Sequence, residues 1–574
     1  MKIKLSRFFA VFGGVALLLM PAFVRQAAAQ STANAPRGFA ITNARIVTAA
    51  GADIERGTII VRDGLIVAVG AGNVQVPVDV RVIDANGLTV YPGIIDASAN
   101  TGIPAPRTQQ TTGGGGAQNT AAFLQQQAQQ QAQSNSVYPA GLQPEITAIE
   151  LIRPSDSSIE TARNSGFTTV LVVPRERIFQ GQSALINLSG ETPGEAIVRA
   201  PVGLHVTFQP LQIGQYPVSL MGSFSAVRQM FLDAQQLQQA QANYEKNPRG
   251  ARRPEANKSL EALFPYLPRP NDQSRQNQAP VIFQANTERE IARVLSFARE
   301  FNLRAVISGG AEAHRIADQL KAQDIPVLLS LNFPRRTSSV SPEADPESLN
   351  VLRARAEAPK TAAQLANAGV RFAFQSGGMA NYTDFWANAG RAVQAGLSRQ
   401  AAVRAMTLSS AEIFGVADRM GSIEPGKIAN LTVLRGDIFD RNRAVTHVFV
   451  DGRMYEIPPA PATTTAAGGA AFAAASQAIA GKWNLTMQLG GQTVQATVTL
   501  TPQRNQLTGQ FESTLGNAPI QQGELTPEGF RFVVRLNVGE QTDTVFAGRV
   551  TENQMSGTLT TPQGTSSFTG TKTP

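Results

Sequence analysis

The stretch Tyr91-Pro92-Gly93-Ile94-Ile95-Asp96 separates two kinds of sequence pattern. Before it, residues 38–92 contain short alternating runs that end at turn signals such as Asp63-Gly64 and Asn86-Gly87, which is typical of short strands. After it, from Ile94 to about Ser376, apolar runs alternate with helical patterns. A strand that is buried on both faces needs such an apolar run. The sequence therefore predicts a small all-β region followed by an α/β region.

The α/β region contains eight apolar runs that predict strands. We expect these strands at Ile94–Ala99, Thr168–Val173, Ala184–Leu188, Gly203–Phe208, Val281–Ala285, Ala305–Ser308, Val327–Leu331 and Phe372–Phe374. Helical patterns lie between several of them, and in the clearest one Thr287 and Glu290 form a capping box. Eight strands with helical crossovers over about 280 residues favour a (β/α)8 barrel of the TIM type. The pattern alone leaves a doubly wound sheet open.

The remainder of the chain returns to β patterns. Residues 421–456 contain strand-like runs, after helices that we expect at 389–395 and 400–406. Residues 458–478 are rich in Pro, Thr, Ala and Gly, which predicts a linker. Residues 479–574 then alternate apolar and polar residues in roughly eight short runs. These runs predict a C-terminal all-β domain, either an up-and-down barrel or a small sandwich.

The composition of the chain excludes several classes of protein. Its 574 residues indicate two or three domains, and 42% hydrophobic against 16% charged residues permit a large core. The absence of cysteine excludes disulfide scaffolds, thiolate zinc sites and cysteine nucleophiles. The net charge of +8 falls to +4 without the four basic residues of the first 29 (8 − 4 = 4), and no basic tract with aromatic residues remains. We therefore expect no nucleic-acid partner.

Residues 1–29 have the pattern of a secretory signal peptide. Three basic residues precede the apolar run Phe8–Met20, and Ala27-Ala28-Ala29 offers a small-residue cleavage site. The apolar run is shorter than the ~20 residues of a membrane-spanning helix, which disfavours an uncleaved anchor. We expect a secreted or periplasmic protein with no transmembrane segment after cleavage. Residues 109–137 are rich in Gly and Gln and predict a low-complexity surface insertion.

Four parts of the sequence resemble the amidohydrolase superfamily, in particular its secreted bacterial imidazolonepropionase-like branch. These parts are Ile41–Val47 with Val61–Ile66, Tyr91–Asp96, Gly166–Val170, and Met420–Lys427 with Asn430–Val433. The resemblance implies a barrel over residues 93–414, beside a composite β-sandwich made of residues 38–92 and 415–457. By lineage it also implies hydrolysis of carbon–nitrogen bonds in cyclic amides.

The resemblance further implies one or two divalent metal ions, such as zinc, at the C-terminal mouth of the barrel. The family carries two histidines spaced i and i+2 after the Pro-Gly-x-Ile-Asp motif, on one face of a strand. Here Ser98 and Asn100 hold these positions. The strands that usually add two more histidines and an aspartate end here in side-chain amides and hydroxyls, which are not usual zinc ligands. We expect no metal cofactor and a site for a polar ligand made of Ser98, Asn100, His205, Gln284, Asn286, Ser308 and Ser376.

The chain has only three histidines. His314 falls in a helical pattern and is expected on the surface. His447 is expected in the closing strand of the sandwich, away from the barrel mouth. His205 lies in an expected barrel strand, where both a pocket role and ordinary packing stay open.

Other catalytic arrangements have little support in the sequence. Asp96 is expected to anchor a strand end, and Glu312 and Asp384 are expected at helix starts. A serine nucleophile needs a base, and the one conceivable pair is Ser98 with His205. The sequence has no Gly-x-Ser-x-Gly motif, no P-loop and no dinucleotide-binding motif in a suitable setting.

Three functions follow as hypotheses. The favoured one is a metal-free, non-catalytic relative of the hydrolases, a pseudoenzyme that binds a small polar ligand at the barrel mouth. The second is an active hydrolase of carbon–nitrogen bonds that uses atypical metal ligands. The third is an envelope protein that binds partners through its C-terminal β domain. Association into a homo-oligomer is open under each of them.

Overall fold

The chain is described from a computed structural model. It covers residues 38–104, 138–335, 347–458 and 475–573, apart from gaps at 73, 140, 175–176, 191, 212–215, 251, 270–273, 378, 380, 441, 490–491, 504–505, 514–515, 527–528, 539, 552 and 562–563. The expected signal peptide, the low-complexity segment 109–137 and most of the expected linker lie outside the described residues. Among the helices described, none combines the length and the apolar character needed to cross a membrane.

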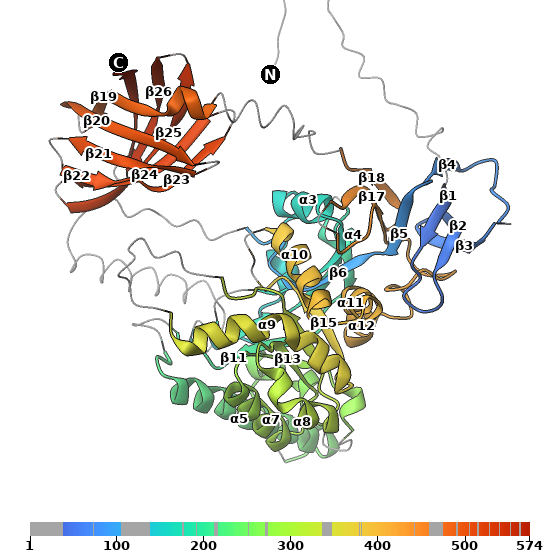
Figure 1. Ribbon diagram of the computed structural model, residues 1–574. Coiled ribbons are helices and arrows are strands. Elements are labelled where there is room, and N and C mark those ends of the chain that lie inside the picture. The colour runs from blue at the N-terminus through green and yellow to red at the C-terminus, as the bar shows by residue number, and fades with distance from the viewer. Residues whose placement is uncertain are drawn as a thin grey trace, which may run out of the picture.

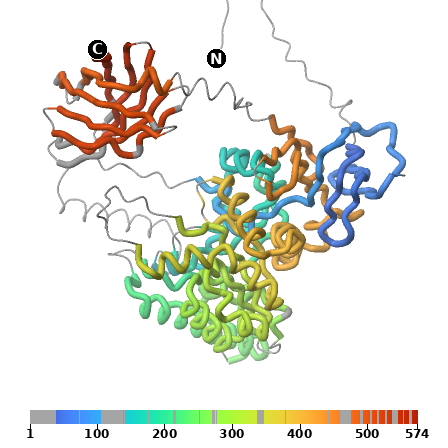
Figure 2. Tube along the Cα trace, viewed as in Figure 1, coloured from blue at the N-terminus to red at the C-terminus, as the bar shows by residue number. Residues whose placement is uncertain are grey.

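Strands from both ends of the region 38–456 form one eight-stranded sheet. They are β1 (Gly38–Ile46), β2 (Ile54–Arg62), β3 (Leu65–Ala71), β4 (Arg81–Asp84), β5 (Leu88–Pro92), β16 (Leu431–Arg435), β17 (Ala444–Val450) and β18 (Arg453–Glu456). The order is β18-β17-β16-β5-β1-β2-β3, and β4 also pairs with β1. Figure 2 shows the blue and orange segments side by side, where β5 and β16 pair in antiparallel fashion. The composite arrangement of early and late strands is therefore present.

The described part of the α/β region contains ten strands in two sheets. They are β6 (Ile94–Ala99), β7 (Phe167–Val172), β8 (Phe179–Gln182), β9 (Ala184–Asn187), β10 (Ile197–Arg199), β11 (Leu204–Thr207), β12 (Val281–Ala285), β13 (Ala305–Gly309), β14 (Val327–Ser330) and β15 (Phe372–Gln375). The sheets have the orders β10-β9-β7-β6 and β15-β14-β13-β12-β11-β8. Every strand that was expected from an apolar run is present to within one residue at either end.

The two sheets are connected at both sides. Only Ser183 separates β8 from β9, so these strands join one sheet to the other. On the opposite side β15 adjoins β6, where the backbone N–H of Ser376 donates to Asp96 Oδ1 at 2.9 Å. Apolar side chains from both sheets, such as Leu171 and Ile282, share one buried cluster. The strands thus surround a common interior, as in a barrel.

One of the eight barrel positions differs from the expected parallel arrangement. β9 runs antiparallel to β7, and β8 runs antiparallel to β11. The chain between Val172 and Phe179 is too short for the dozen or more residues that a parallel crossover needs. The third strand therefore departs from the (β/α)8 pattern expected from the sequence, because the chain turns back after β7 and β9 pairs with it in antiparallel fashion.

Helices connect the later strands and cover their outer side (Figure 1). Their bounds are α2 (Ala148–Leu151), α3 (Ser157–Asn164), α4 (Pro193–Ala196), α5 (Leu220–Lys246), α6 (Lys258–Glu261), α7 (Glu288–Glu300), α8 (Ala317–Ala322), α9 (Leu349–Asn367), α10 (Tyr382–Gln394), α11 (Arg399–Met406) and α12 (Leu408–Ile413). The expected capping box of α7 is confirmed, because Thr287 Oγ1 accepts from the backbone of Glu290 and the Glu290 carboxylate accepts from the backbone of Thr287. This cap fixes the start of α7 directly after β12.

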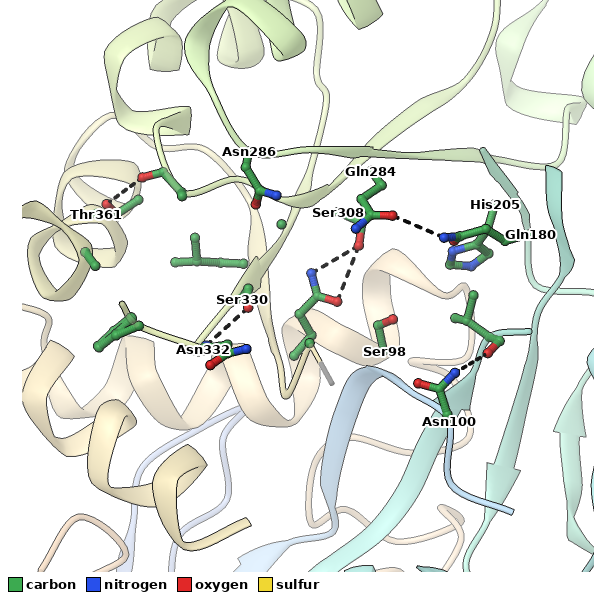
Figure 3. A pocket seen from close by; sticks show the side chains of 18 of the residues that line it. Ser98, Asn100, Gln180, His205, Gln284, Asn286, Ser308, Ser330, Asn332 and Thr361 are labelled. Carbon is green, nitrogen blue, oxygen red and sulfur yellow. Dashed lines mark hydrogen bonds between the residues drawn. The ribbon is translucent and has the colours of Figure 1, made fainter. Parts of the chain in front are cut away.

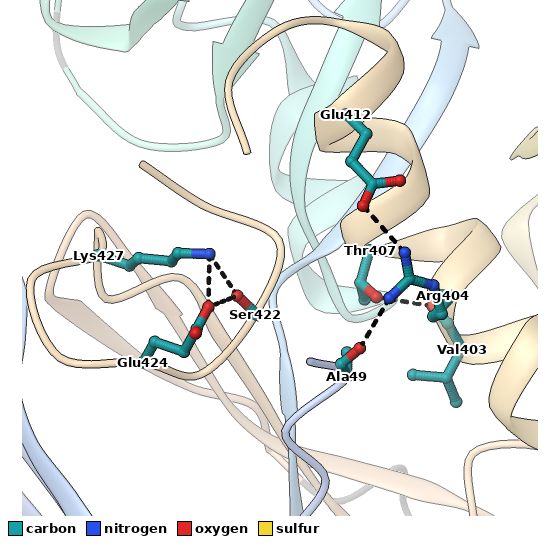
Figure 4. A network of polar contacts seen from close by, with 8 residues as sticks. All are labelled: Ala49, Val403, Arg404, Thr407, Glu412, Ser422, Glu424 and Lys427. Atoms are coloured by element: carbon teal, nitrogen blue, oxygen red, sulfur yellow. Dashed lines mark hydrogen bonds and ion pairs between the residues drawn. The ribbon is translucent and has the colours of Figure 1, made fainter. Parts of the chain in front are cut away.

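The turn Ser422–Lys427 belongs to a sequence motif of the family resemblance, and its role here is structural. Lys427 Nζ lies 2.6 Å from the Glu424 carboxylate, and both groups contact the hydroxyl of Ser422 (Figure 4). The backbone of Lys427 accepts a hydrogen bond from Ile66 of β3 at 2.8 Å. The turn therefore attaches the eight-stranded sheet to the chain that leaves the α/β region.

A second polar network joins the sheet to the helices after β15. Arg404 of α11 pairs with Glu412 of α12 at 2.9 Å and donates to the carbonyl of Ala49 at 3.3 Å (Figure 4). Since Ala49 follows β1, this arginine links the N-terminal strands to the last helices of the α/β region.

The C-terminal strands form a closed antiparallel barrel. They are β19 (Gly481–Leu489), β20 (Gln492–Gln503), β21 (Gln506–Ser513), β22 (Gly516–Pro519), β23 (Gln521–Thr526), β24 (Gly529–Val538), β25 (Glu540–Thr551), β26 (Gln554–Thr561) and β27 (Gly564–Lys572). The sheet closes because β20 pairs with β21 as well as with β19. Trp483, Phe511, Phe532 and Phe546 are fully buried in its core. The up-and-down barrel is confirmed over the small sandwich.

Candidate functional site

A cavity of about 500 Å³ lies where the barrel strands end. Side chains from β6, β8, β11, β12, β13, β14 and β15 line it, together with residues of α9. Six of the seven residues expected at the mouth line this cavity: Ser98, Asn100, His205, Gln284, Asn286 and Ser308 (Figure 3). The tertiary structure therefore brings together residues that lie up to 210 positions apart (308 − 98 = 210). Their contact with a ligand stays a prediction.

The end of β6 is irregular. The pairing of β6 with β7 shifts register between Asp96 and Ala99, which is a bulge in the strand. Ser98 and Asn100 both reach the cavity, and Asn100 Nδ2 donates to the carbonyl of Val173 at 3.1 Å. The Asn100 side chain is thereby held at the rim beside β7.

His205 and two glutamines form one polar wall of the cavity (Figure 3). Gln180 Nε2 of β8 donates to Gln284 Oε1 of β12 at 3.1 Å. His205 of β11, which lies between these strands, is only 2% exposed, and its Nε2 atom is buried without a partner among the described residues. Burial lowers the pKa of His205 from 6.5 to about 3. The imidazole is therefore neutral at ordinary pH, with one ring nitrogen as donor and the other as acceptor.

The opposite strands contribute a second set of hydrogen bonds. Gln375 Nε2 of β15 donates to Ser308 Oγ of β13 at 3.1 Å and to the carbonyl of Leu328 at 2.6 Å. Gln375 thus bridges three neighbouring strands below the mouth.

Ser376 does not line the cavity, and its part in ligand binding stays a prediction. Its hydroxyl donates to the carbonyl of Ser98 at 3.4 Å, and its backbone N–H donates to Asp96. Gln375 and Gly377 reach the cavity in its place. The reason is that Ser376 lies at the seam between β15 and β6, where its polar groups hold the barrel together.

Asp96 is a fully buried carboxylate beside this seam. Its Oδ1 atom accepts from the backbone of Ser98 at 3.2 Å and of Ser376 at 2.9 Å, while Oδ2 has no partner among the described residues. Burial raises the pKa of Asp96 from 3.8 to about 6, against the opposing effect of these hydrogen bonds. Asp96 does not line the cavity, and its contacts support the expected role as a strand-end anchor.

Two glycines with positive φ make room for polar side chains of the cavity. A Cβ atom at Gly309 (φ +105°) would lie 2.3 Å from Asn286 Oδ1, and one at Gly377 (φ +59°) would lie 2.5 Å from Ser330 Oγ. Both positions therefore need glycine for conformation and for space.

The donor set around the cavity does not fit the metal site that the family resemblance implies. The lining residues of the described chain include one histidine and no carboxylate. Within that same described part, no group of three or more His, Asp or Glu side chains is arranged to hold a metal ion. Hydroxyl and side-chain amide groups are weak ligands for zinc.

Serine-based catalysis also lacks its geometry. Among the described residues, no hydrogen bond joins Ser98 to His205, and the low pKa of His205 makes its imidazole a poor base. Ser422 does contact Lys427, but both side chains also bind the Glu424 carboxylate, and the three groups lie in a turn away from the cavity (Figure 4).

The remaining sequence candidates have structural roles. Glu312 accepts from the backbone of Glu288 at 2.9 Å, at the start of α7. Asp384 lies in the first turn of α10 and pairs with Arg335. His314 is half-buried, with Nδ1 3.2 Å from Thr361 Oγ1. His447 lies in β17, opposite Glu456 of β18.

Sequence reasoning missed several lining residues. Gln180 belongs to the motif Gln180–Ala184, which stood out in the sequence without an assigned chemistry. Gln375 was one position from the expected Ser376. Asn332 follows β14, and Thr361 lies on α9. No local sequence pattern marks either of them as a lining residue.

Comparison with known proteins gives three findings. A family model described as the amidohydrolase family matches residues 155–455, which are 301 of 574 residues. Adenine deaminase of Moorella thermoacetica is 42% identical over 65 residues, so the match spans 11% of this chain and 10% of that relative. A solved amidohydrolase of Thermotoga maritima MSB8 is similar in fold, with a TM-score of 0.59 and 23% identity over 73% of this chain and 100% of the other.

Proposed function

The chain belongs to the amidohydrolase family, and from this premise we propose that it is a non-catalytic member that binds a polar ligand at the barrel mouth. The observation that carries the proposal is the cavity of about 500 Å³, whose polar side chains are hydroxyls, amides and one neutral imidazole. Its volume is in the ~300–1,000 Å³ range of small-molecule sites.

The chemistry of the lining residues supports the absence of hydrolysis. Hydrolysis of an amide needs an activated water or nucleophile and a group that stabilises the developing oxyanion. In the family the metal ion supplies both the low-pKa water and the Lewis acid. None of the described side chains at this mouth carries a charge or an available base, because His205 is buried and neutral. Ligand binding requires neither.

The proposal includes two finer points of fold and location. The α/β region is a (β/α)8 barrel in origin, whose third unit is replaced by the consecutive strands β8 and β9, which run antiparallel to β11 and β7. The protein is exported, as the first 29 residues indicate. Both points are consistent with a ligand-binding protein of the cell envelope.

Metal content is the decisive experiment. The protein is purified without chelator, incubated with zinc, manganese and magnesium, desalted and measured by elemental mass spectrometry. We expect far less than one ion per chain and no hydrolysis of hydantoins, lactams or dipeptides above the uncatalysed rate. A Ser98→His, Asn100→His variant, which adds two strand-end imidazoles near His205, is the control for ion retention.

The opposite result has a clear meaning. One or more ions retained per wild-type chain, together with turnover, would establish an active hydrolase with atypical ligands and end the non-catalytic proposal. Retained ions that are lost in an Asn100→Ala variant would locate that metal at the mouth.

A further inference from the structure

We propose that the ligand of the mouth cavity is an uncharged, polyhydroxylated molecule, a small neutral carbohydrate. This inference rests on the proposed function, since it names the chemical class that the same cavity binds. Three features of the cavity carry it: the lack of charge, the arrangement of donors and acceptors, and an apolar wall.

The lack of charge comes first. None of the described residues that line the cavity is Asp, Glu, Lys or Arg, and the one titratable group, His205, is neutral because of burial. A ligand carboxylate, phosphate or ammonium group would lose its water without gaining an opposite charge, which is costly. The cavity therefore disfavours amino acids, peptides with free termini and sugar phosphates.

The polar wall offers donors and acceptors together. The Gln180–Gln284 hydrogen bond uses one N–H and one oxygen, so Gln284 Nε2 and Gln180 Oε1 keep their hydrogen-bonding capacity within the described structure. His205 Nε2 is buried beside them without a partner in that part of the chain. This nitrogen is enclosed, so the two glutamine atoms are the groups that a ligand in the cavity contacts. Hydroxyl groups suit this wall because each both donates and accepts.

The β14 side of the cavity adds apolar surface. Leu329 and Phe333 are buried lining residues of β14 and the segment after it, and Ala358 lines the cavity from α9. The labelled polar residues Gln180 and His205 lie on the other side in Figure 3. A sugar ring has hydroxyls at its edge and C–H groups on its faces, so it can contact both sides at once. A ligand that is polar all round would leave this apolar wall in contact with water.

Matched ligand pairs test the charge requirement. Isothermal titration calorimetry on the full exported chain uses glucose, N-acetylglucosamine, maltose and cellobiose. Each sugar is added up to about 10 mM, which exceeds a dissociation constant of about 1 mM, typical of weak specific binding. The charged counterparts are glucuronate, glucosamine and glucose 6-phosphate. We expect at least one neutral sugar to bind, and its charged counterparts to bind at least tenfold more weakly.

A charge introduced into the wall is the second arm. Gln284→Glu keeps the shape of the side chain and an acceptor for Gln180, but it adds a carboxylate to the cavity. We expect it to shift the ratio of glucosamine to neutral-sugar affinity at least tenfold towards glucosamine. Gln319→Glu, on the exposed face of α8, is the matched control and should leave the ratio unchanged. Unchanged melting temperatures show that both variants fold.

Three outcomes overturn the inference. It fails if no neutral sugar binds, or if the charged counterparts bind as tightly as the neutral sugars. It also fails if Gln284→Glu leaves the affinity ratio unchanged, because binding is then elsewhere. In these cases the non-catalytic proposal still stands if the same preparation retains no metal and shows no turnover. Retained metal together with turnover ends that proposal, whether or not a sugar binds.

Discussion

Replacing Asp96 with asparagine separates the electrostatic cost of burying this carboxylate from its role as a hydrogen-bond acceptor. The pKa of Asp96 rises from 3.8 to about 6 on folding. At 1.36 kcal/mol per pKa unit, this difference of about 2.2 units corresponds to ~3 kcal/mol. The wild-type protein should lose this amount of stability as the pH rises, and the Asp96→Asn variant should not.

The direction follows from the order of deprotonation. Below pH 3.8 the carboxyl is protonated in both states, so it does not affect the free energy of unfolding through its charge. Between pH 3.8 and about 6 the unfolded chain loses its proton first, and the folded state becomes relatively less stable. Above about pH 6 the loss is complete. The difference in unfolding free energy between variant and wild type should therefore increase by ~2.5 kcal/mol in favour of the variant from pH 4 to pH 7.5, the rest of the ~3 kcal/mol being lost below pH 4.

The groups around Asp96 do not change this pH-dependent difference in stability between the variant and the wild type. Burial raises the pKa of Tyr382, which faces Asp96, so this phenol stays neutral throughout the range. The asparagine keeps Oδ1 as an acceptor for the backbone of Ser98 and Ser376. Its Nδ2 lacks a partner, which lowers stability by an amount that does not depend on pH and so cancels in the comparison.

Urea unfolding followed by tryptophan fluorescence measures the effect. The chain has two tryptophans, and Trp483 lies in the C-terminal barrel. A Trp483→Phe background therefore leaves Trp386, which donates to the carbonyl of Ser165, as the reporter of the α/β region. A difference between Asp96→Asn and its parent that stays constant from pH 4 to pH 7.5 would refute the reasoning. Asp96→Ala is the contrast, since it removes the acceptor and should destabilise at every pH.

Three further predictions test the site and the cores. Gly309→Ala should destabilise the protein by ~1–3 kcal/mol through backbone strain and the clash with Asn286. Gly87 also has a positive φ but has open space around its Cβ, so Gly87→Ala should show only the smaller cost of strain in the same urea titration. The ring signals of His205 in NMR spectra should not shift between pH 5 and pH 8, because its pKa is near 3; a titration with a midpoint near 6.5 would show that the imidazole is solvated. Phe546→Ala should cost ~3–5 kcal/mol in unfolding of the C-terminal barrel, followed by Trp483 fluorescence, and a cost under ~1 kcal/mol would contradict a well-packed interior.

Local sequence patterns predict the strands of this protein well because burial on two faces imposes a local requirement. A strand such as β12 must be apolar along its whole length, whatever its neighbours are. The same holds for the capping box of α7, whose partners lie three residues apart. The direction of β9 was not predictable in this way, since its apolar run is equally suited to a parallel or an antiparallel neighbour. The connection between β7 and β8 is too short for a parallel crossover, and this makes β9 antiparallel to β7.

The candidate site was predictable as a set of strand ends but not in its contacts. Ser98 and Gln284 were expected at the mouth because the C-terminal ends of barrel strands meet there. The exchange of Ser376 for Gln375 depends on the seam with β6, which involves residues about 280 positions away. Gln180 enters the cavity only because the chain reverses after β7 and β8 pairs with β11.

Sequence alone thus determined which residue types are present for chemistry: three histidines, no cysteine, and hydroxyls and amides at the expected strand ends. Only the tertiary structure decided that these side chains surround one cavity, and that His205 lies in it as a buried, neutral group. The physical reason is that composition and periodicity report the local requirements of each segment. Desolvation, register and closure arise between segments that are distant in the chain, and these set the protonation state and the neighbours of each polar group.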